Sequence, residues 1–397
     1  MIRRHNQVAT SGRCRLAAAV VSLSSIGCAT SRQSATTIED SAGVIIATSP
    51  GIDLPAPWRL EPVATIGGAE SGAENLDRLA EETVGADTLG KVYVISEADA
   101  QVIVFDSAGH HLTTLGRKGG GPGEVQTAGS LYVDPTGRAF VQDYGKSAIV
   151  QFLADGTTGR EASLASIVDR LYGGIRLVGD TLLVHGELPT TRPRREALWA
   201  MAPSDTVTLA TIDQMASIGE LHACNYRMRG LTRTFAAQMN WTSGGGMVVV
   251  NSTAAYQVDL FKANRLVRRI RRNVPLAPAN GAMIKRLYPT GRMYGGPECI
   301  VSAEQIEREV GAADNVPAIR GVAIDLSGRV WVGRFSFPDE APRTDVFSPE
   351  GNYLGTFVGL TVPLAFPSRD LLVTPVVDSV TDIARLLVAR FRPLGPS

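Results

Sequence analysis

The sequence feature that most constrains the fold is a turn followed by a strand, which recurs along the chain. An Asp-x-x-Gly turn precedes an alternating strand with an aromatic centre in the segments 87–94, 134–141 and 325–332. Asp at the first turn position accepts hydrogen bonds from the backbone ahead of it, and Gly adopts the positive φ that closes a hairpin. A second turn follows another alternating strand in each unit. Each unit therefore predicts a four-stranded antiparallel meander.

The centres of the second strands set the period of this repeat. Successive centres are 47, 43, 66, 82 and 41 residues apart, and they are Tyr93, Phe140, Leu183, Val249, Trp331 and Leu372. Units of four strands at such a spacing are typical of a β-propeller, whereas a pair of β-sandwiches, the competing fold, needs no fixed period. The six centres predict an all-β fold of six four-stranded antiparallel blades.

The two ends of the predicted ring complement each other. The stretch from Asp370 supplies three strands, and the segment 60–67 resembles the fourth strands at 112–116 and 354–359. An N-terminal strand that completes the last blade would remove an exposed sheet edge. Residues 275–318 form an insertion before blade five, in which Ser302 and Gln305 predict the capping-box start of a short helix.

The arginine-rich run RLVRRIRR at 265–272 follows the third strand of the fourth unit. This position predicts an outermost strand, whose solvated arginines protect an open edge against aggregation. A surface that binds a membrane or a nucleic acid is the competing interpretation of the run.

The first 28 residues have the pattern of an export signal. Residues 1–15 are polar and basic, and residues 16–26 are apolar but too few to span a bilayer as a helix. The tetrad Ser25-Ile-Gly-Cys28 resembles a bacterial lipobox, in which Cys28 would receive lipid, although the lipobox prefers Leu at the position of Ser25. The alternative is cleavage nearby and free release. We expect residues 29–41 to form a flexible tether and residues 42–397 to form the propeller.

Charge and location narrow the range of partners. The chain has 39 basic and 39 acidic residues, but the first 27 residues contain four arginines and no acid. The remainder is therefore acidic, which argues against nucleic-acid binding. We expect a monomer that faces the periplasm, is held at the outer membrane through its lipid alone, or is secreted. Its partner would be a ligand or an envelope protein.

Only two cysteines belong to the predicted propeller. In an oxidising compartment Cys224 and Cys299 could form a disulfide, or they could be two small buried apolar residues. Sequence alone leaves both alternatives open.

The segment between the first and second units reads LGRKGGGPGEV, at 115–125. It resembles the Gly-x-Gly-Pro-Gly-Glu linker of the six-bladed β-propeller lipoproteins of environmental and gut bacteria, whose blades are similar to NHL repeats. Trp58, the SAEQIE segment and the DLSGRVWV strand pair are further points of resemblance, which extends over residues 42–392. The resemblance implies a fold and an exported location, but no catalytic residues.

The most plausible site is the face where the second strands end, because propellers usually bind at this end of the central channel. A polar ligand or a divalent cation could be held by carboxylate, His, Tyr, Asn and Arg side chains there. The candidates are Glu97, Asp143, Tyr144, His185, Glu187, Asn251 and Arg334, together with Arg117 and Glu124 from the glycine segment. Each of them could equally be part of a solvated loop rim.

No catalytic constellation stands out in the sequence. His185 with Glu187 is the first choice for acid–base chemistry, but no Ser-His-Asp arrangement or metal-ligand spacing is present. We therefore expect a binding protein without a cofactor. The alternative is a metal-dependent hydrolase or lyase of the gluconolactonase-like propeller type, in which Glu97, Asp143 and Asn251 would hold calcium.

Overall fold

The computed structural model describes residues 35–68, 76, 79–80, 82–164, 170–187, 196–202, 205–212, 218–294, 299–377 and 384–395. The predicted signal, Cys28 and residues 29–34 of the predicted tether lie outside the described residues. The rest of that tether is not free, because Thr37–Ser41 form the first strand.

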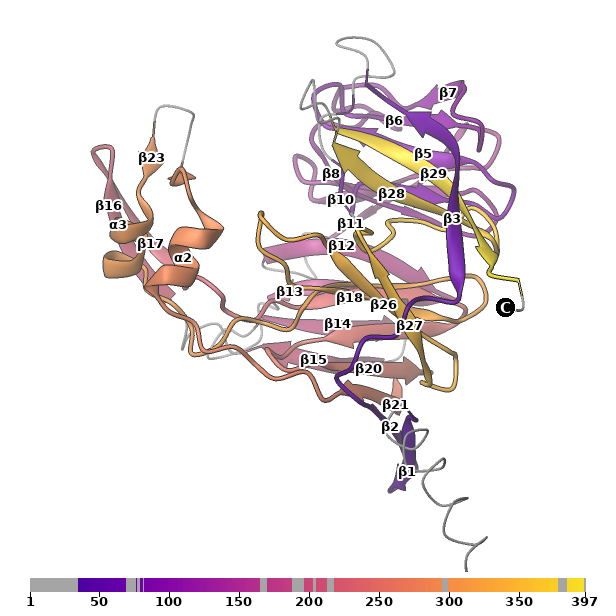
Figure 1. Cartoon of the computed structure of the whole chain (residues 1–397). Helices are drawn as coiled ribbons and strands as arrows, with labels where there is room; N and C mark the ends of the chain where they lie inside the picture. The colour runs from indigo at the N-terminus through magenta and orange to yellow at the C-terminus, as the bar shows by residue number, and fades with distance from the viewer. Residues whose placement is uncertain are drawn as a thin grey trace, which may run out of the picture.

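The described chain is mostly β-strand and forms small antiparallel sheets in a propeller-like arrangement (Figure 1). One sheet consists of β4 (Val84–Ala86), β5 (Val92–Ser96), β6 (Gln101–Phe105) and β7 (His111–Leu115). The next consists of β8 (Ala128–Val133), β9 (Ala139–Asp143), β10 (Ala148–Phe152) and β11 (Thr158–Ser163). A third consists of β12 (Arg170–Val178), β13 (Thr181–Glu187), β14 (Glu196–Ala202) and β15 (Asp205–Ile212). A fourth consists of β24 (Ile319–Ile324), β25 (Val330–Arg334), β26 (Arg343–Phe347) and β27 (Tyr353–Val358).

Two sheets include strands from the N-terminal part of the chain. The sheet of β18 (Asn240–Gly244), β19 (Met247–Asn251), β20 (Gln257–Lys262) and β21 (Arg265–Arg272) is extended by β2 (Val44–Ser49) and β1 (Thr37–Ser41). The last sheet consists of β28 (Leu371–Val377), β29 (Ala384–Pro393) and β3 (Trp58–Ile66). Because β3 pairs antiparallel with β29, the prediction that an N-terminal strand joins the C-terminal sheet is confirmed. The described residues from Asp370 onward supply two strands of this sheet, not the three that were predicted.

The arginine-rich strand β21 differs from its prediction. It is not at an edge, because β2 pairs with it in parallel along residues 268–272. Its arginines are also not all solvated: the side chain of Arg272 is fully buried. The alternation of basic and apolar residues in this strand therefore reflects cover by the N-terminal segment and a buried ion pair, neither of which has a local sequence signal.

The recurring turns explain why the second strands carry aromatic residues. In the first turn Asp87 accepts hydrogen bonds from the backbone N–H of Lys91 and from the hydroxyl of Tyr93, at 2.9 and 3.0 Å. In the last, Asp325 accepts one from the indole N–H of Trp331 at 3.0 Å. The turn carboxylate therefore satisfies the polar atom of an otherwise buried aromatic side chain.

Apolar side chains fill the space between neighbouring sheets. Trp331 is fully buried and packs against the rings of Phe357, Phe366 and Phe391, with centroids 5.6 to 5.7 Å away. Similar clusters lie between each pair of consecutive sheets, and one joins the β4–β7 sheet to the β28–β29–β3 sheet. The core of the molecule is therefore divided among these clusters between neighbouring sheets.

A separate lobe stands beside the sheets and is drawn at the left of Figure 1. It consists of β16 (Ile218–Ala223), β17 (Tyr226–Thr232), α2 (Gly281–Leu287), β22 (Arg292–Met293), β23 (Ile300–Val301) and α3 (Ala303–Glu309). The predicted helix start is confirmed, since Ser302 accepts a hydrogen bond from the Gln305 backbone N–H at the start of α3, while the Gln305 side chain donates to the His222 carbonyl oxygen rather than closing a capping box. A disulfide between Cys224 and Cys299 joins the β16–β17 hairpin to the start of β23, within the 275–318 insertion. The two cysteines, for which the sequence left two alternatives open, are therefore paired.

The segment between β2 and β3 runs across β27. Gly355 of β27 has φ +144°, and a Cβ there would lie 2.5 Å from the carbonyl oxygen of Pro55, so only glycine permits this approach. Among the described residues, no helix is long and apolar enough to cross a membrane.

Candidate functional site

The main candidate site is a cavity of about 760 Å³, which we call the His185 cavity. It opens where the second strands β13 and β25 end and where β12, β18 and β24 begin. These three are the first strands of their sheets in sequence, and we call such strands inner strands. The charged side chains of its described wall are Glu82, Arg176, His185, Glu196, Arg320, Arg334 and Arg343. A second cavity of about 440 Å³ lies among the Asp134 and Asp325 turns, at the other end of the inner strands. Arg176 lines both cavities.

Irregular pairing of the inner strands shapes the wall. The register of β12 shifts between Leu171 and Ile175, and that of β24 shifts between Ile319 and Gly321. Such a bulge re-aims a side chain, and the shift in β24 falls at Arg320, which lines the cavity.

A buried histidine–carboxylate hydrogen bond lies in the wall between β13 and β14. His185 Nε2 is 2.7 Å from Glu196 Oε1, and the two side chains are 8% and 5% exposed. The site depends on Gly173 in β12, because a Cβ at that position would lie 2.9 Å from His185 Nδ1. The second oxygen, Glu196 Oε2, is buried and has no hydrogen-bond partner among the described residues.

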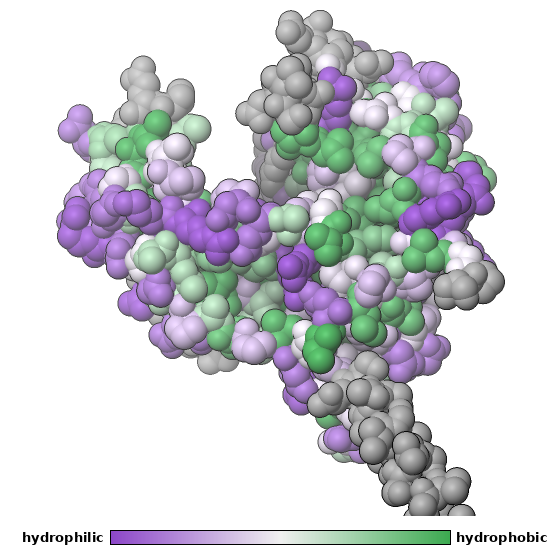
Figure 2. Space-filling model, in the orientation of Figure 1, coloured by the Kyte–Doolittle hydropathy of each residue, from purple (hydrophilic) through white to green (hydrophobic). Residues whose placement is uncertain are grey.

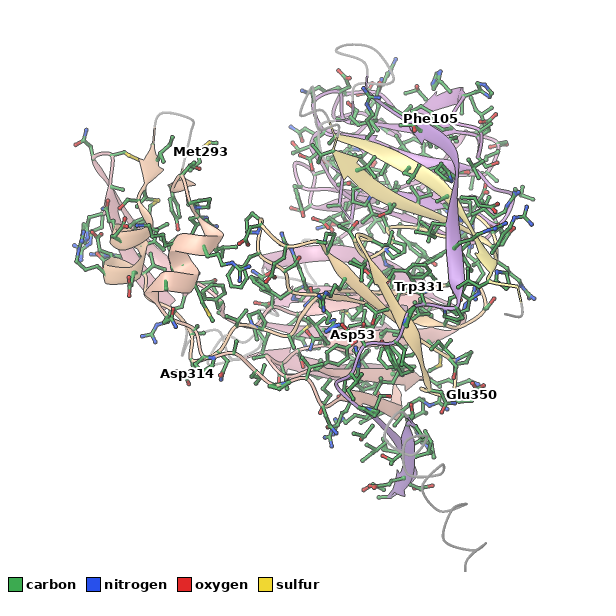
Figure 3. All side chains as sticks on the ribbon, in the orientation of Figure 1. Asp53, Phe105, Met293, Asp314, Trp331 and Glu350 are labelled. Atoms are coloured by element: carbon green, nitrogen blue, oxygen red, sulfur yellow. A yellow bond between two sulfur atoms is a disulfide. The ribbon has the colours of Figure 1, made fainter. Side chains whose placement is uncertain are left out.

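Two of the cavity arginines bind a carboxylate from the N-terminal segment. Asp53 accepts from Arg334 Nη2 at 2.5 Å and from Arg343 Nη1 at 2.9 Å. Partial burial opposes ionisation of Asp53, but the positive charges of Arg334 and Arg272 outweigh it and hold the pKa of this carboxyl below its usual 3.8. Figure 3 places Asp53 beside the β24–β27 sheet, far from Met293 in the lobe.

A fully buried cluster supports these arginines from behind. Asp345 Oδ2 accepts from Arg272 Nη1 at 2.8 Å and from the Tyr256 hydroxyl at 2.6 Å, and Arg334 Nε lies 3.5 Å from it. Thr356 donates to the other oxygen at 2.5 Å. Burial, and then the negative charge of Asp345, raise the pKa of Tyr256 well above 10. Tyr256 is therefore a fixed donor that holds Asp345 in place.

Arg320 differs from the other arginines of the wall. It is exposed, and nothing in the described part of the chain pairs with its guanidinium. Met239 and Trp241 add an apolar stretch of wall beside it, from the start of β18. Trp241 is 8% exposed and lies 5.9 Å from the guanidinium of Arg176.

Of the nine candidate residues from the sequence, His185 and Arg334 line the His185 cavity. Asp143 is fully buried and accepts hydrogen bonds from the backbone N–H groups of Gln126 and Thr127, at 2.7 and 2.9 Å. Asn251 donates to the carbonyl oxygens of Thr253 and Gln257, both at 3.0 Å. Asp143 and Asn251 thus brace their own loops.

The glycine segment closes on itself. Glu124 accepts from Arg117 Nε and from the Gly121 backbone N–H, both at 2.8 Å. Glu97 and Tyr144 do not line the His185 cavity either. Glu187 ends β13, but its side chain lies outside the described part of the structure.

Two members of the donor set of the metal-dependent alternative, Asp143 and Asn251, hydrogen-bond to their own loops as described above. Within the described residues no group of three or more His, Cys, Asp or Glu side chains is placed to hold a metal ion.

Sequence reasoning missed five charged residues of the wall: Glu82, Arg176, Glu196, Arg320 and Arg343. It also missed the ion pairs behind the wall, of Asp53, Arg272 and Asp345. Glu196 starts the strand that pairs with the His185 strand. In this pairing His185 lies opposite Leu198, so Glu196 is a diagonal neighbour of His185 on the same face, and a hairpin alignment could have found it. The long connection between the two strands hid that register. Asp53 is more than 280 residues from Arg334 and Arg343 and has no local signal.

The chain matches no model of a known protein family, and a search of curated proteins found no relative. Among solved structures it is similar to a protein of Bacteroides fragilis that is described as exported, at 11% identity and a TM-score of 0.51. This match covers 88% of this chain and 99% of the other. It is also similar to a DUF4221 family member from Bacteroides vulgatus, at 9% identity, 84% and 98% coverage and a TM-score of 0.47. A virginiamycin B lyase from Staphylococcus aureus matches at 10% identity, 84% and 99% coverage and a TM-score of 0.38. The Bacteroides fragilis match shows a shared fold alone.

Proposed function

We propose that this chain is an exported six-bladed β-propeller that binds a small organic anion in the His185 cavity. Six apolar clusters, each between two consecutive sheets, support the ring. The cluster that packs Val92 and Phe105 against Leu371 and Val388 would close it, with β3 as the outer strand of the sixth blade.

One observation carries the ligand class: four arginines line the cavity, against two glutamates. Asp53 and Asp345 are shared by Arg272, Arg334 and Arg343, and Arg320 has no counter-ion in the described structure. A guanidinium offers several donors in a planar fork that matches a carboxylate. The cavity volume is within the roughly 300–1,000 Å³ of pockets that enclose a small-molecule ligand.

The test is calorimetric titration of the purified protein with acetate, propionate and succinate. The variant Arg320→Gln should bind them roughly tenfold to a hundredfold more weakly, because a hydrogen bond to a charged group contributes about 1.5–3 kcal/mol. The matched control is Arg265→Gln, on the exposed start of β21. Equal loss in both variants, or no binding by the wild type, would contradict the proposal.

The location rests on the sequence of residues 1–28, and the export ascribed to the Bacteroides fragilis protein agrees with it. We propose that Cys28 carries the lipid that tethers the propeller in the bacterial envelope. Replacing Cys28 with Ser should move the protein from the membrane fraction to the soluble fraction. Unchanged partitioning would mean that the chain is exported without a lipid.

A further inference from the structure

Two polar side chains lie at the same end of the gap between the β18–β21 sheet and the β24–β27 sheet. Asn240 begins β18, Arg320 is the second residue of β24, and both line the His185 cavity. The cavity opens on the side of the molecule where a notch separates the lobe from the sheets (Figure 2). The strands β18 and β24 pack against each other, and both run from the His185 cavity to the second cavity.

The register of these two strands places Asn240 and Arg320 at the same level, on faces that point toward each other. A Cβ on Gly244 would lie 2.7 Å from Ile324 Cγ2, and Asn240 and Arg320 are each four residues nearer the start of their strands. By alternation Asn240 is on the face of Gly244, opposite to the face on which Trp241 packs against the β12–β15 sheet. Arg320 follows the alternation of Ile324, which packs against the β18–β21 sheet.

A hydrogen-bond relay fixes which atom Asn240 offers to the cavity. Asn251 Nδ2 donates to the carbonyl oxygens of Thr253 and Gln257, so Asn251 presents its Oδ1 as an acceptor. This oxygen accepts from Asn240 Nδ2 at 3.2 Å, and the same Nδ2 donates to a backbone carbonyl at 3.3 Å. Asn240 Oδ1 accepts no hydrogen bond from the described residues. It is therefore an acceptor that a ligand bound to Arg320 can use.

A neutral donor suits this acceptor. On the β24–β27 side of the cavity the arginines outnumber the two aspartates that three of them share, so the excess positive charge repels an ammonium group. A hydroxyl group donates to an amide oxygen without adding a charge.

From this arrangement we infer that the ligand is a hydroxycarboxylate. Its carboxylate binds Arg320, and a hydroxyl on the α or β carbon donates to Asn240 Oδ1. This inference rests on the proposed anion-binding function and narrows it, because it requires a hydroxyl donor beside the carboxylate.

The experiment compares hydroxy acids with analogues that lack the hydroxyl group. The pairs are lactate with propionate, 3-hydroxybutyrate with butyrate, and malate with succinate, each chiral acid as both enantiomers, and calorimetry measures their binding to the purified protein. We expect at least one hydroxy acid to bind roughly twofold to tenfold more tightly than its analogue, which is the value of one neutral hydrogen bond. Asn240→Leu should abolish this preference, whereas Arg320→Gln should weaken the binding of both members of the pair.

A control variant and a second ligand accompany the test. Asn273→Leu changes an exposed asparagine beyond the end of β21 and should leave the preference unchanged. Because Asn240 is half-buried, the thermal midpoint of each variant is measured. If Asn240→Leu does not fold, 2-methoxypropionate tests the same hydrogen bond in the wild type. It keeps the oxygen of lactate but has no hydroxyl proton, so it should bind no more tightly than propionate.

The outcomes separate this inference from the proposal beneath it. If no hydroxy acid binds more tightly than its analogue, if the preference survives in a folded Asn240→Leu variant, or if alanine or 2-methoxypropionate binds as tightly as lactate, the hydroxycarboxylate inference is overturned and anion binding through Arg320 stands. If none of these carboxylates binds, both are overturned.

Discussion

Replacing Arg272 with Met should be among the most damaging substitutions in the sheets. The side chain is fully buried, donates to Asp345 at 2.8 Å and also donates to the carbonyl oxygens of Pro50 and Ile52. Methionine of similar length fills the space but removes the guanidinium that donates to the fully buried Asp345, and Arg334 Nε, 3.5 Å away, is then its remaining arginine neighbour. Breaking a buried ion pair costs about 3–5 kcal/mol, because the remaining charge loses its partner. Tyr256 and Thr356 still donate to Asp345, so we expect a loss of about 3–4 kcal/mol in the free energy of unfolding.

The same strand offers a matched control. Arg269 of β21 also pairs with an aspartate, through two hydrogen bonds to Asp259 at 2.7 and 2.8 Å, but its side chain is 27% exposed. Arg269→Met should therefore cost about 1 kcal/mol or less. Urea unfolding followed by tryptophan fluorescence measures both variants. If the two variants lose the same free energy, burial does not set the value of these pairs and the reasoning is refuted.

Two further predictions concern pH and the lobe. Because the pKa of Asp53 is lowered in the folded state, its ion pairs stabilise the protein fully above the unfolded value near 3.8 and are lost as the pH falls through the lower folded value. Asp53→Asn should therefore lower the thermal midpoint at pH 7 by more than at pH 3, and an equal difference at both pH values would contradict this. The Cys224–Cys299 bond closes a separation of 75 residues, so its removal should cost about 4 kcal/mol by loop entropy. Reduction should speed hydrogen exchange in 218–232 and 299–309 while leaving exchange in β8–β11 unchanged, and protection that survives reduction in the lobe would show that its apolar core suffices.

Sequence patterns predicted the repeating part of the fold because its signals are local. Each turn aspartate bonds to backbone four residues ahead, as Asp87 does to Lys91 and Asp325 to Arg329, so the motif specifies the turn by itself. Phe140 lies in a second strand for this reason, after the Asp134 turn, and the predicted centre Leu183 also lies in a second strand, whereas Leu372 lies in β28, the first strand of its described sheet.

The parts that were not predicted depend on contacts between distant segments. The polar composition of Thr37–Ser41 suggests a tether, but pairing with β2 makes it a strand. The lobe combines insertions from two separate connections, and its α2 helix has an Asn280 cap that the capping-box pattern did not include. In the candidate site, His185 and Arg334 were predicted because they lie near the ends of second strands. Arg320 was not predicted because it lies at a bulge in β24, and the alternation of apolar and polar residues in a sequence does not reveal a bulge.

The pairing of β3 with β29 has a consequence for the order of folding. β2 and β3 leave the ribosome before the sheets that they complete, β2 awaiting β21 and β3 awaiting β29, which follows more than 300 residues later. The strands β4 to β15 can pair with close neighbours in sequence as soon as they are available, as β1 can with β2, but β3 stays unpaired until the last strand, β29, arrives. Pairings of such long range are slow because the intervening chain must first be brought together. Closure should therefore be the final step, and any protein that binds the waiting N-terminal strands would act as a holdase for this chain.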